Sequence, residues 1–166
     1  MGSRVSAAVV TALALVAVPV LSAPVRSASE ETVKLVAQRA HTSLGTSLPV
    51  SLTTFVVGGP LLDATDGRRV GEGKTVCTFT DVRPFVVPPE ASADCRSVYT
   101  LARGQVHLSS SRVYYVDFSG VHYRETKLAI TGGTDDYRTA RGDATGTFRK
   151  SASGVSYSVD IRLTTG

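Results

Sequence analysis

Five of the six tyrosines are the side chains of this sequence best suited to handle a small molecule. A tyrosine presents an apolar ring face to an unsaturated chain and a hydroxyl group to a carbonyl. Tyr99 and Tyr157 stand on the apolar faces of their predicted strands, so we expect them to point inward and to act on a bound molecule. Ordinary core packing is the alternative for each of them. The full set of candidates is Tyr99, Tyr114, Tyr115, Tyr123 and Tyr157.

Other reactive side chains give weaker signals. Asp135 and Asp136 are adjacent carboxylates that could act as an acid or a base, but such pairs more commonly stabilise a turn. His107, His122 and Glu125 are not at ligand spacing on one strand face, so we predict no metal site. No catalytic trio is apparent in the sequence.

The elements that must position these residues are strands, because the apolar pattern has a period of two throughout. The clearest run has Val155, Tyr157 and Val159 on one face and Ser156 and Ser158 on the other. Eight or nine short strands in about 135 residues predict an all-β fold, an antiparallel barrel or sandwich. After an alternating stretch at 33–37, the predicted strands cover 52–62, 74–80, 97–101, 105–110, 113–118, 123–131, 142–149 and 155–163.

The segment 81–94 contains three prolines, which remove hydrogen-bond donors from any strand ladder. We therefore predict an exposed loop there, draped over one end of the fold. Cys77 and Cys95 flank this segment, and an even cysteine count in an exported chain favours a disulfide over two buried thiols. The apolar run 85–87 is the one feature that would support a role in protein interaction.

The N-terminus has the pattern of a secretory signal peptide. A short basic segment ending at Arg4 precedes an apolar run over 5–21, and small residues suit cleavage between Ala23 and Glu30. The alternative is an uncleaved membrane anchor. We therefore predict a signal peptide and linker over 1–28, a single barrel domain over 29–166, and a secreted or extracytoplasmic protein that has no membrane association after cleavage.

Charge gives little support to a nucleic-acid partner. The whole chain has a formal net charge of +4, with 18 basic and 14 acidic side chains, and loss of Arg4 and Arg26 with the leader lowers it to +2. The basic residues are also scattered, whereas a nucleic-acid footprint forms a stripe or patch. We expect no nucleic-acid binding.

Residues 129–142, AITGGTDDYRTARG, are the most diagnostic stretch. Gly132 and Gly133 can end a strand in a conformation closed to other residues, and 134–140 is too polar for a core strand. This stretch resembles the GGTGxYxxARG signature of the dirigent and allene oxide cyclase barrel superfamily. The resemblance extends over about residues 31–163, with one departure at Asp135, where the signature has glycine.

The resemblance implies an eight-stranded antiparallel barrel whose lumen holds one apolar small molecule. Members of this superfamily fold an unsaturated substrate into one conformation, so that ring closure or coupling gives one stereoisomer. Confinement of this kind requires neither a nucleophile nor a cofactor. Arg141 matches the arginine of the signature and would orient a carbonyl or carboxylate; a structural clamp on the corner's carbonyls is its alternative role.

Two functions follow from this resemblance. The first is a cofactor-free cyclase or isomerase with Arg141, Tyr99 and Tyr157 as catalytic residues, acting on an apolar, polyketide-like substrate by cycloaddition. The second is a non-catalytic, lipocalin-like binding barrel. A homo-oligomer is a further possibility. In either case the expected ligand-binding residues along the lumen are Tyr115, Tyr123, Phe79 and Phe148.

Overall fold

The computed structural model describes residues 28–45, 52–117, 120–151 and 154–166. The predicted leader in residues 1–27 lies outside this described part. Among the described residues, no helix is long and apolar enough to cross a membrane. The strands are β1 (Ser29–Gln38), β2 (His41–Thr42), β3 (Thr54–Asp63), β4 (Arg69–Arg83), β5 (Glu90–Leu101), β6 (Gly104–Asp117), β7 (Gly120–Tyr123), β8 (Thr126–Gly133), β9 (Arg141–Ser151) and β10 (Gly154–Thr165).

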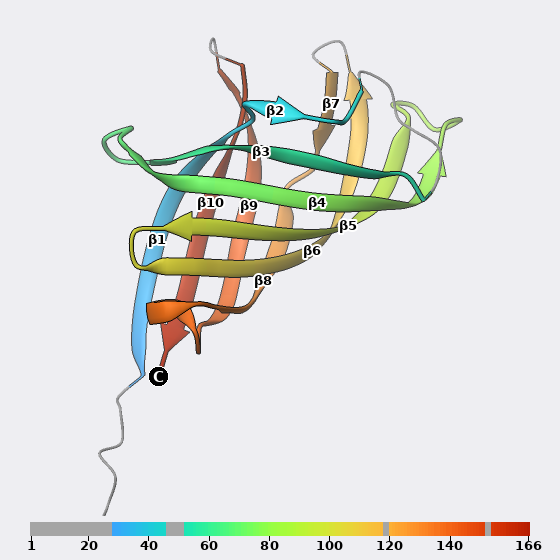
Figure 1. The fold of residues 1–166 in the computed structure, drawn as a ribbon. Coiled ribbons are helices and arrows are strands. Elements are labelled where there is room, and N and C mark those ends of the chain that lie inside the picture. The colour runs from blue at the N-terminus through green and yellow to red at the C-terminus, as the bar shows by residue number, and fades with distance from the viewer. Residues whose placement is uncertain (1–27, 46–51, 118–119, 152–153) are drawn as a thin grey trace, which may run out of the picture.

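Eight strands of the described chain form a closed antiparallel barrel in the order β1-β10-β9-β8-β6-β5-β4-β3, and β1 pairs with β3 to close it. The short strands β2 and β7 are appended to β3 and β6. Figure 1 shows β3 to β6 crossing steeply in front of β1 and β8 to β10. The predicted all-β class and the eight-stranded antiparallel barrel are confirmed.

Three predicted boundaries were wrong. The stretches 105–110 and 113–117 belong to one strand, β6, because its inward alternation continues without a break, and residue 118 of the second predicted strand lies outside the described residues. The stretch 123–131 is divided between β7 and β8. The loop predicted over 81–94 is much shorter, since β4 reaches Arg83 and β5 begins at Glu90.

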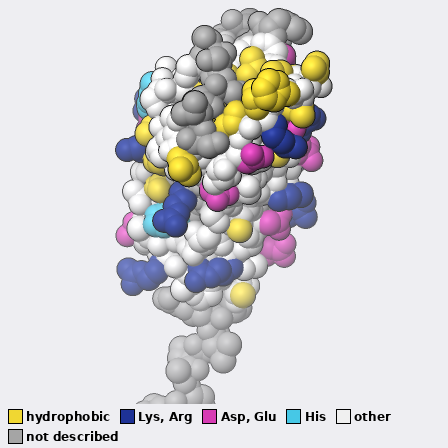
Figure 2. Space-filling model, turned by 90° about the vertical axis from the view of Figure 1, so that its right-hand side faces the viewer, with side chains coloured by type: hydrophobic (Ala, Val, Ile, Leu, Met, Phe, Trp, Pro, Cys, Tyr) yellow, Lys and Arg dark blue, Asp and Glu magenta, His cyan; other side chains and the backbone are white. Residues whose placement is uncertain are grey.

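The β4–β5 hairpin is longer than predicted because its three prolines all lie at its tip, outside the paired residues. Phe85 and Val87 project from this tip with 97% and 98% of their surface exposed. Figure 2 shows apolar side chains gathered on this side of the molecule, near the top. Further from the tip of the same hairpin, Cys77 and Cys95 are directly opposite each other and form the predicted disulfide.

The interior contains two apolar clusters. The lower cluster lies at the end where the chain terminates in Figure 1, and its members are Leu35, Leu61, Tyr99, Val106, Leu108, Leu128, Ile130, Tyr137, Ala140, Ala144, Val159, Ile161 and Leu163. The upper cluster lies toward the other end and consists of Phe55, Cys77, Phe79, Ala91, Ala93, Cys95, Tyr114, Val121, Tyr123 and Tyr157. Both are built mainly from the inward-facing positions of strands, and Tyr137 and Ala140 join the lower cluster from the corner between β8 and β9.

The diagnostic stretch 129–142 forms a tight corner that caps the lower cluster. A single 3₁₀ turn, η1 (Asp135–Tyr137), follows β8 and buries the ring of Tyr137. Asp135 adopts a φ of 50°, the left-handed conformation that glycine ordinarily supplies and that Asp tolerates. Although Asp135 replaces the glycine of the GGTG signature, the backbone at this position is still left-handed.

Candidate functional site

A small cavity lies inside the barrel, where the two apolar clusters meet. It reaches the surface beside Gln38, Arg39 and Leu44, which are all partly exposed. Its volume is about 50 Å³, enough for a few water molecules only. The lining consists of Ala37, Gln38, Arg39, Leu44, Val57, Gly58, Gly59, Gly73, Thr75, Tyr99, Arg112, Tyr114, Tyr123 and Tyr157.

Four tyrosine rings form much of the cavity wall. Tyr123 and Tyr157 stack with ring centroids 4.1 Å apart and planes 6° from parallel. Tyr114 packs edge-on against Tyr123 at 5.7 Å. Burial raises the pKa of Tyr99, Tyr114, Tyr123 and Tyr157 above the ordinary value for a phenol. These hydroxyls are therefore neutral hydrogen-bonding groups at neutral pH.

Arg112 is the charged group at the centre of the site. It extends inward from β6, is 5% exposed, and donates from Nε to Ser110 Oγ at 2.9 Å and from Nη2 to Ser97 Oγ at 3.1 Å. Its guanidinium carbon lies 4.7 Å from the centre of the Tyr123 ring. Burial opposes the charge, but the phenol groups of Tyr123, Tyr114 and Tyr99 favour it. A hydrogen bond with the Tyr114 hydroxyl adds to this, and the pKa of Arg112 lies above its ordinary value.

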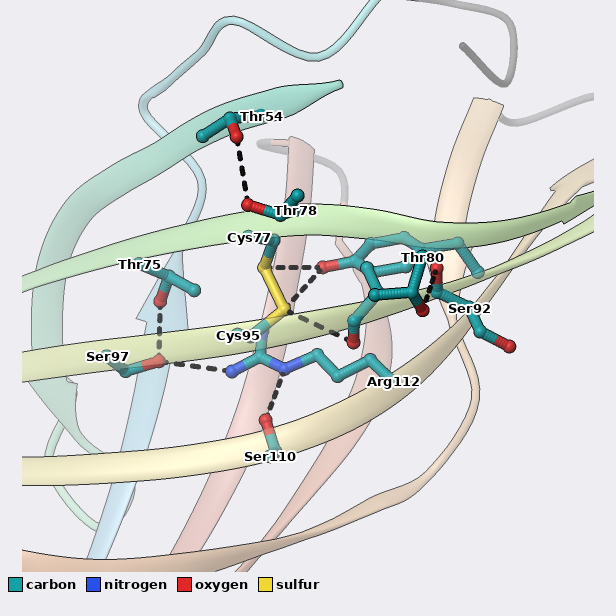
Figure 3. The surroundings of a disulfide bond; sticks show 12 residues. Thr54, Thr75, Cys77, Thr78, Thr80, Ser92, Cys95, Ser97, Ser110 and Arg112 are labelled. Carbon is teal, nitrogen blue, oxygen red and sulfur yellow. Dashed lines mark hydrogen bonds between the residues drawn. A yellow bond between two sulfur atoms is a disulfide. The ribbon is translucent and has the colours of Figure 1, made fainter. Parts of the chain in front are cut away.

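A polar belt separates the two apolar clusters on the β4, β5 and β6 side of the lumen (Figure 3). Thr75 and Ser97 share a hydrogen bond of 2.8 Å between their hydroxyls, and Ser97 in turn accepts from Arg112. Directly above the belt, the Tyr114 hydroxyl lies 3.4 Å from Cys77 Sγ and 3.8 Å from Cys95 Sγ. The disulfide thus forms part of the wall that positions Tyr114.

Three of the seven predicted site residues line the cavity: Tyr99, Tyr157 and Tyr123. Phe79 is buried in the wall beside it, against the rings of Phe55 and Tyr114. The structure does not bring the other three predicted residues into the lining.

Phe148, Tyr115 and Arg141 lie away from the cavity. Phe148 is partly buried and packs on Tyr157, with ring centroids 5.8 Å apart. Tyr115 packs beneath the guanidinium of Arg124 at 5.5 Å. Arg141 is exposed at the start of β9 and donates to the carbonyl of Ala140 at 2.7 Å, the contact expected of a structural clamp on the corner.

Arg112 is the site residue that sequence reasoning missed. The inward positions of β6 are Val106, Leu108, Ser110, Arg112 and Tyr114. Dividing this stretch into two strands at Ser110 removed Arg112 from the pattern. One unbroken alternation would have placed a cation on the apolar face, which is the signal that was available.

No group of three or more His, Cys, Asp or Glu side chains within the described ranges is arranged to hold a metal ion. His107 is half-buried and hydrogen-bonds Gln105, whereas buried His122 lies 3.4 Å from Asp117, so the two histidines have separate surroundings.

Comparison with known proteins identifies the fold. No family model and no curated protein matches the sequence. Among solved structures, a pyocyanin demethylase superposes with a TM-score of 0.58 at 20% identity, over 80% of this chain and 99% of that one. A dirigent protein that is a pterocarpan synthase superposes with a TM-score of 0.53 at 14% identity, over 82% of this chain and 89% of that one. The chain has a dirigent-like barrel fold.

The resemblance predicted from residues 129–142 is thereby confirmed at the level of the fold. In this dirigent-like barrel the diagnostic stretch closes one end, and the cavity lies further along the lumen. The two similar structures carry names of different reactions, so the dirigent-like fold leaves the chemistry to the residues of the lumen.

Proposed function

We propose that this barrel binds an unsaturated small molecule in its lumen and directs its stereoselective cyclisation without a cofactor. The observation that supports this most is the combination of four tyrosine rings with one fixed cation, Arg112, around a single interior cavity. Rings supply an apolar, shape-selective wall, and Arg112 supplies one polar anchor that sets the orientation of the ligand. The names of the two similar structures, a demethylase and a synthase, also associate this fold with small-molecule chemistry.

The reaction would require the tyrosine stack to open. The cavity of about 50 Å³ is far smaller than the volume of a typical ligand site, about 300–1,000 Å³. If one ring of the Tyr123–Tyr157 pair moves aside, a planar substrate can stack on the other ring in its place. The remaining ring would then serve as a flat wall against which the unsaturated chain of the substrate folds.

A cycloaddition within one molecule suits such a lumen. Two π bonds are consumed and two σ bonds form, so the product is an isomer, with no oxidant, reductant or leaving group. Confinement in the reactive conformation lowers the entropic part of the barrier. A carbonyl of the substrate held by Arg112 would be polarised, which stabilises charge that develops in the transition state.

A non-catalytic carrier is the second candidate, and the chemistry of the lining favours it in one respect. No Asp, Glu or His lines the cavity, and the pKa values of its tyrosines are raised. The cavity lining therefore lacks a general base near neutral pH. This suits a carrier that retains its ligand unchanged, and it is equally compatible with a cyclisation that moves no proton.

The disulfide is compatible with an extracytoplasmic location, where such bonds persist. We propose that the barrel acts there, after export by the predicted leader.

Native mass spectrometry tests both candidates. The oxidised protein is incubated with a small-molecule extract of its producer, and the retained compound is released and compared with its free form by chromatography. Release as an isomer supports the cyclase, and release unchanged supports the carrier. Tyr157→Phe and Arg112→Met should alter the isomer ratio or the retained amount, whereas Arg96→Gln, on the outer face of β5, should not. An extract from which no compound is retained would contradict both functions.

A further inference from the structure

The charges around the lumen are unbalanced. Its lining contains two guanidinium groups, Arg112 and Arg39, and no carboxylate. None of the ion pairs within the described part of the chain includes either arginine. The arginines that do form ion pairs there lie at the surface, and the side chain of each is at least 47% exposed.

Arg112 is the more unusual of the two, because a buried arginine is normally paired with an acid. Its partners here are two serine hydroxyls, the Tyr114 hydroxyl and the face of the Tyr123 ring, all uncharged. Such groups offset part of the cost of removing the cation from water, and an anion offsets considerably more. A guanidinium has five N–H donors, so after the bonds to the two serines and to Tyr114 it still has donors to offer a ligand.

Arg39 extends this positive character toward the surface. It lies just after β1, is half-buried, and holds its position by donating from Nη1 to the carbonyl of Val121 at 3.2 Å. Its positive charge partly offsets the rise in the pKa of Tyr114 and Tyr157, and the charge of Arg112 acts on the same two pKa values in the same direction. A negatively charged molecule that approaches the opening therefore meets one cation at the surface and a second at the centre.

We infer that the ligand of the lumen is an anion: an unsaturated molecule with a carboxylate or enolate oxygen that Arg112 binds while the tyrosine rings enclose its apolar part. This inference rests on the proposed function, because it assumes that the lumen is the ligand site, and it narrows the substrate class from apolar molecules to amphipathic acids. The other role open to Arg112 is to complete the polar belt as a structural residue.

Two probes of nearly equal shape separate these roles. Cinnamate is a planar unsaturated acid, and 4-phenylbut-3-en-2-one replaces its carboxylate with an uncharged methyl ketone. Dissociation constants for both are measured with the oxidised protein by amide chemical-shift titration, which also shows whether the perturbed residues surround the lumen. We expect cinnamate to bind at least about tenfold more tightly than the ketone, because a hydrogen bond from a guanidinium to a carboxylate is stronger than one to an uncharged carbonyl.

Variants then assign the preference to a residue. Arg112→Met should remove the preference for cinnamate, Arg112→Lys should retain part of it, and the exposed Arg96→Gln should retain all of it. Equal affinities for the two probes in the unmodified protein would overturn the anion inference and leave the lumen site intact. A preference that survives in folded Arg112→Met would overturn the role of Arg112. If neither probe perturbs lumen residues, the ligand site itself, and with it the proposed function, is contradicted.

Discussion

Arg112 is a buried charge that we expect to cost the free protein stability. Its charge lies inside a barrel whose other inward positions are mostly apolar, and only neutral groups contact it. Sites that hold a charge ready for a ligand commonly cost the free protein stability. The cost should be measurable in the absence of ligand.

We predict that Arg112→Met leaves the free energy of unfolding unchanged or raises it by about 1 kcal/mol, since an apolar side chain of similar length replaces a desolvated cation. Arg112→Ala removes the same charge but leaves a cavity, and it should lower the free energy of unfolding by about 2 kcal/mol. Urea titrations of the three proteins measure the difference. A marked loss in Arg112→Met would indicate that the guanidinium is mainly a structural group.

The buried phenols predict how stability depends on pH. The pKa values of Tyr99, Tyr114, Tyr123 and Tyr157 are raised in the folded state because burial disfavours the phenolate. In the unfolded chain these groups ionise near pH 10. Between the unfolded and folded values the unfolded state binds fewer protons, so stability decreases as pH rises through this window.

We therefore expect a constant contribution from these tyrosines below about pH 10 and a decline of up to about 1.4 kcal/mol per pH unit for each tyrosine above it. Unfolding curves between pH 8 and 12 test this, with phenolate absorbance followed in parallel. Tyr157→Phe should make the decline shallower. Ionisation of all six tyrosines at pH 10 without loss of structure would contradict the buried positions.

At the scale of elements, the corner after β8 shows why a recognisable sequence motif need not be the site. Gly133 lies so close to β6 that an added Cβ would be 2.0 Å from the carbonyl oxygen of Gln105. Thr134 Oγ accepts from the backbone N–H of Gln105 at 3.0 Å, and Tyr137 fills the end of the barrel. The motif therefore encodes a closure that holds β8 against β6.

Gly133→Ala should lower the free energy of unfolding by about 2 kcal/mol or more, because backbone atoms on both sides would have to move. Gly45→Ala is the matched control: a Cβ there has no atom within 4 Å, and we expect a change within about 0.5 kcal/mol. Denaturant unfolding measures both. Equal small effects would show that the corner can relax around an added methyl group.

The strands and the fold could be predicted because period-two alternation and the glycine corner are local patterns. Tyr99 and Tyr157 were found in the same way, from the apolar faces of their strands. Arg141 was assigned to the lumen because the motif was taken as the site, and only the structure shows that its side chain lies outside. Arg112 was missed since a cation in the middle of a strand resembles a break between two strands.

At the scale of the whole molecule, the shortest strand pairing in the barrel is the one between β1 and β3. These strands pair over Leu35–Ala37 and Leu61–Asp63 only, whereas β4 and β5 pair along most of their length. After Ala37 the chain stays beside β3, since the N–H of Ala40 donates to the carbonyl of Gly58 at 3.0 Å and β2 pairs with β3. Residues on both sides of this junction line the cavity. The opening of the cavity and the shortest strand pairing of the barrel therefore coincide.

Local opening at this junction should make its amides exchange with solvent at least about tenfold faster than the paired amides of β4 and β5. Hydrogen exchange followed by mass spectrometry tests this, with the disulfide-linked hairpin as the internal reference. A bound ligand should slow exchange at the junction most. Uniform exchange rates around the barrel would show that the short pairing is not a weak point.

The stacked pair of Tyr123 and Tyr157 also sets a time course for association. With about 50 Å³ free, the resting lumen is filled mostly by its own side chains, and we expect the proposed ligand to enter only after a ring has turned away. The first step is then a motion of the empty protein, which does not depend on ligand concentration. In rapid-mixing experiments the observed rate should approach a plateau as ligand is increased, and that plateau reports how often the barrel opens on its own.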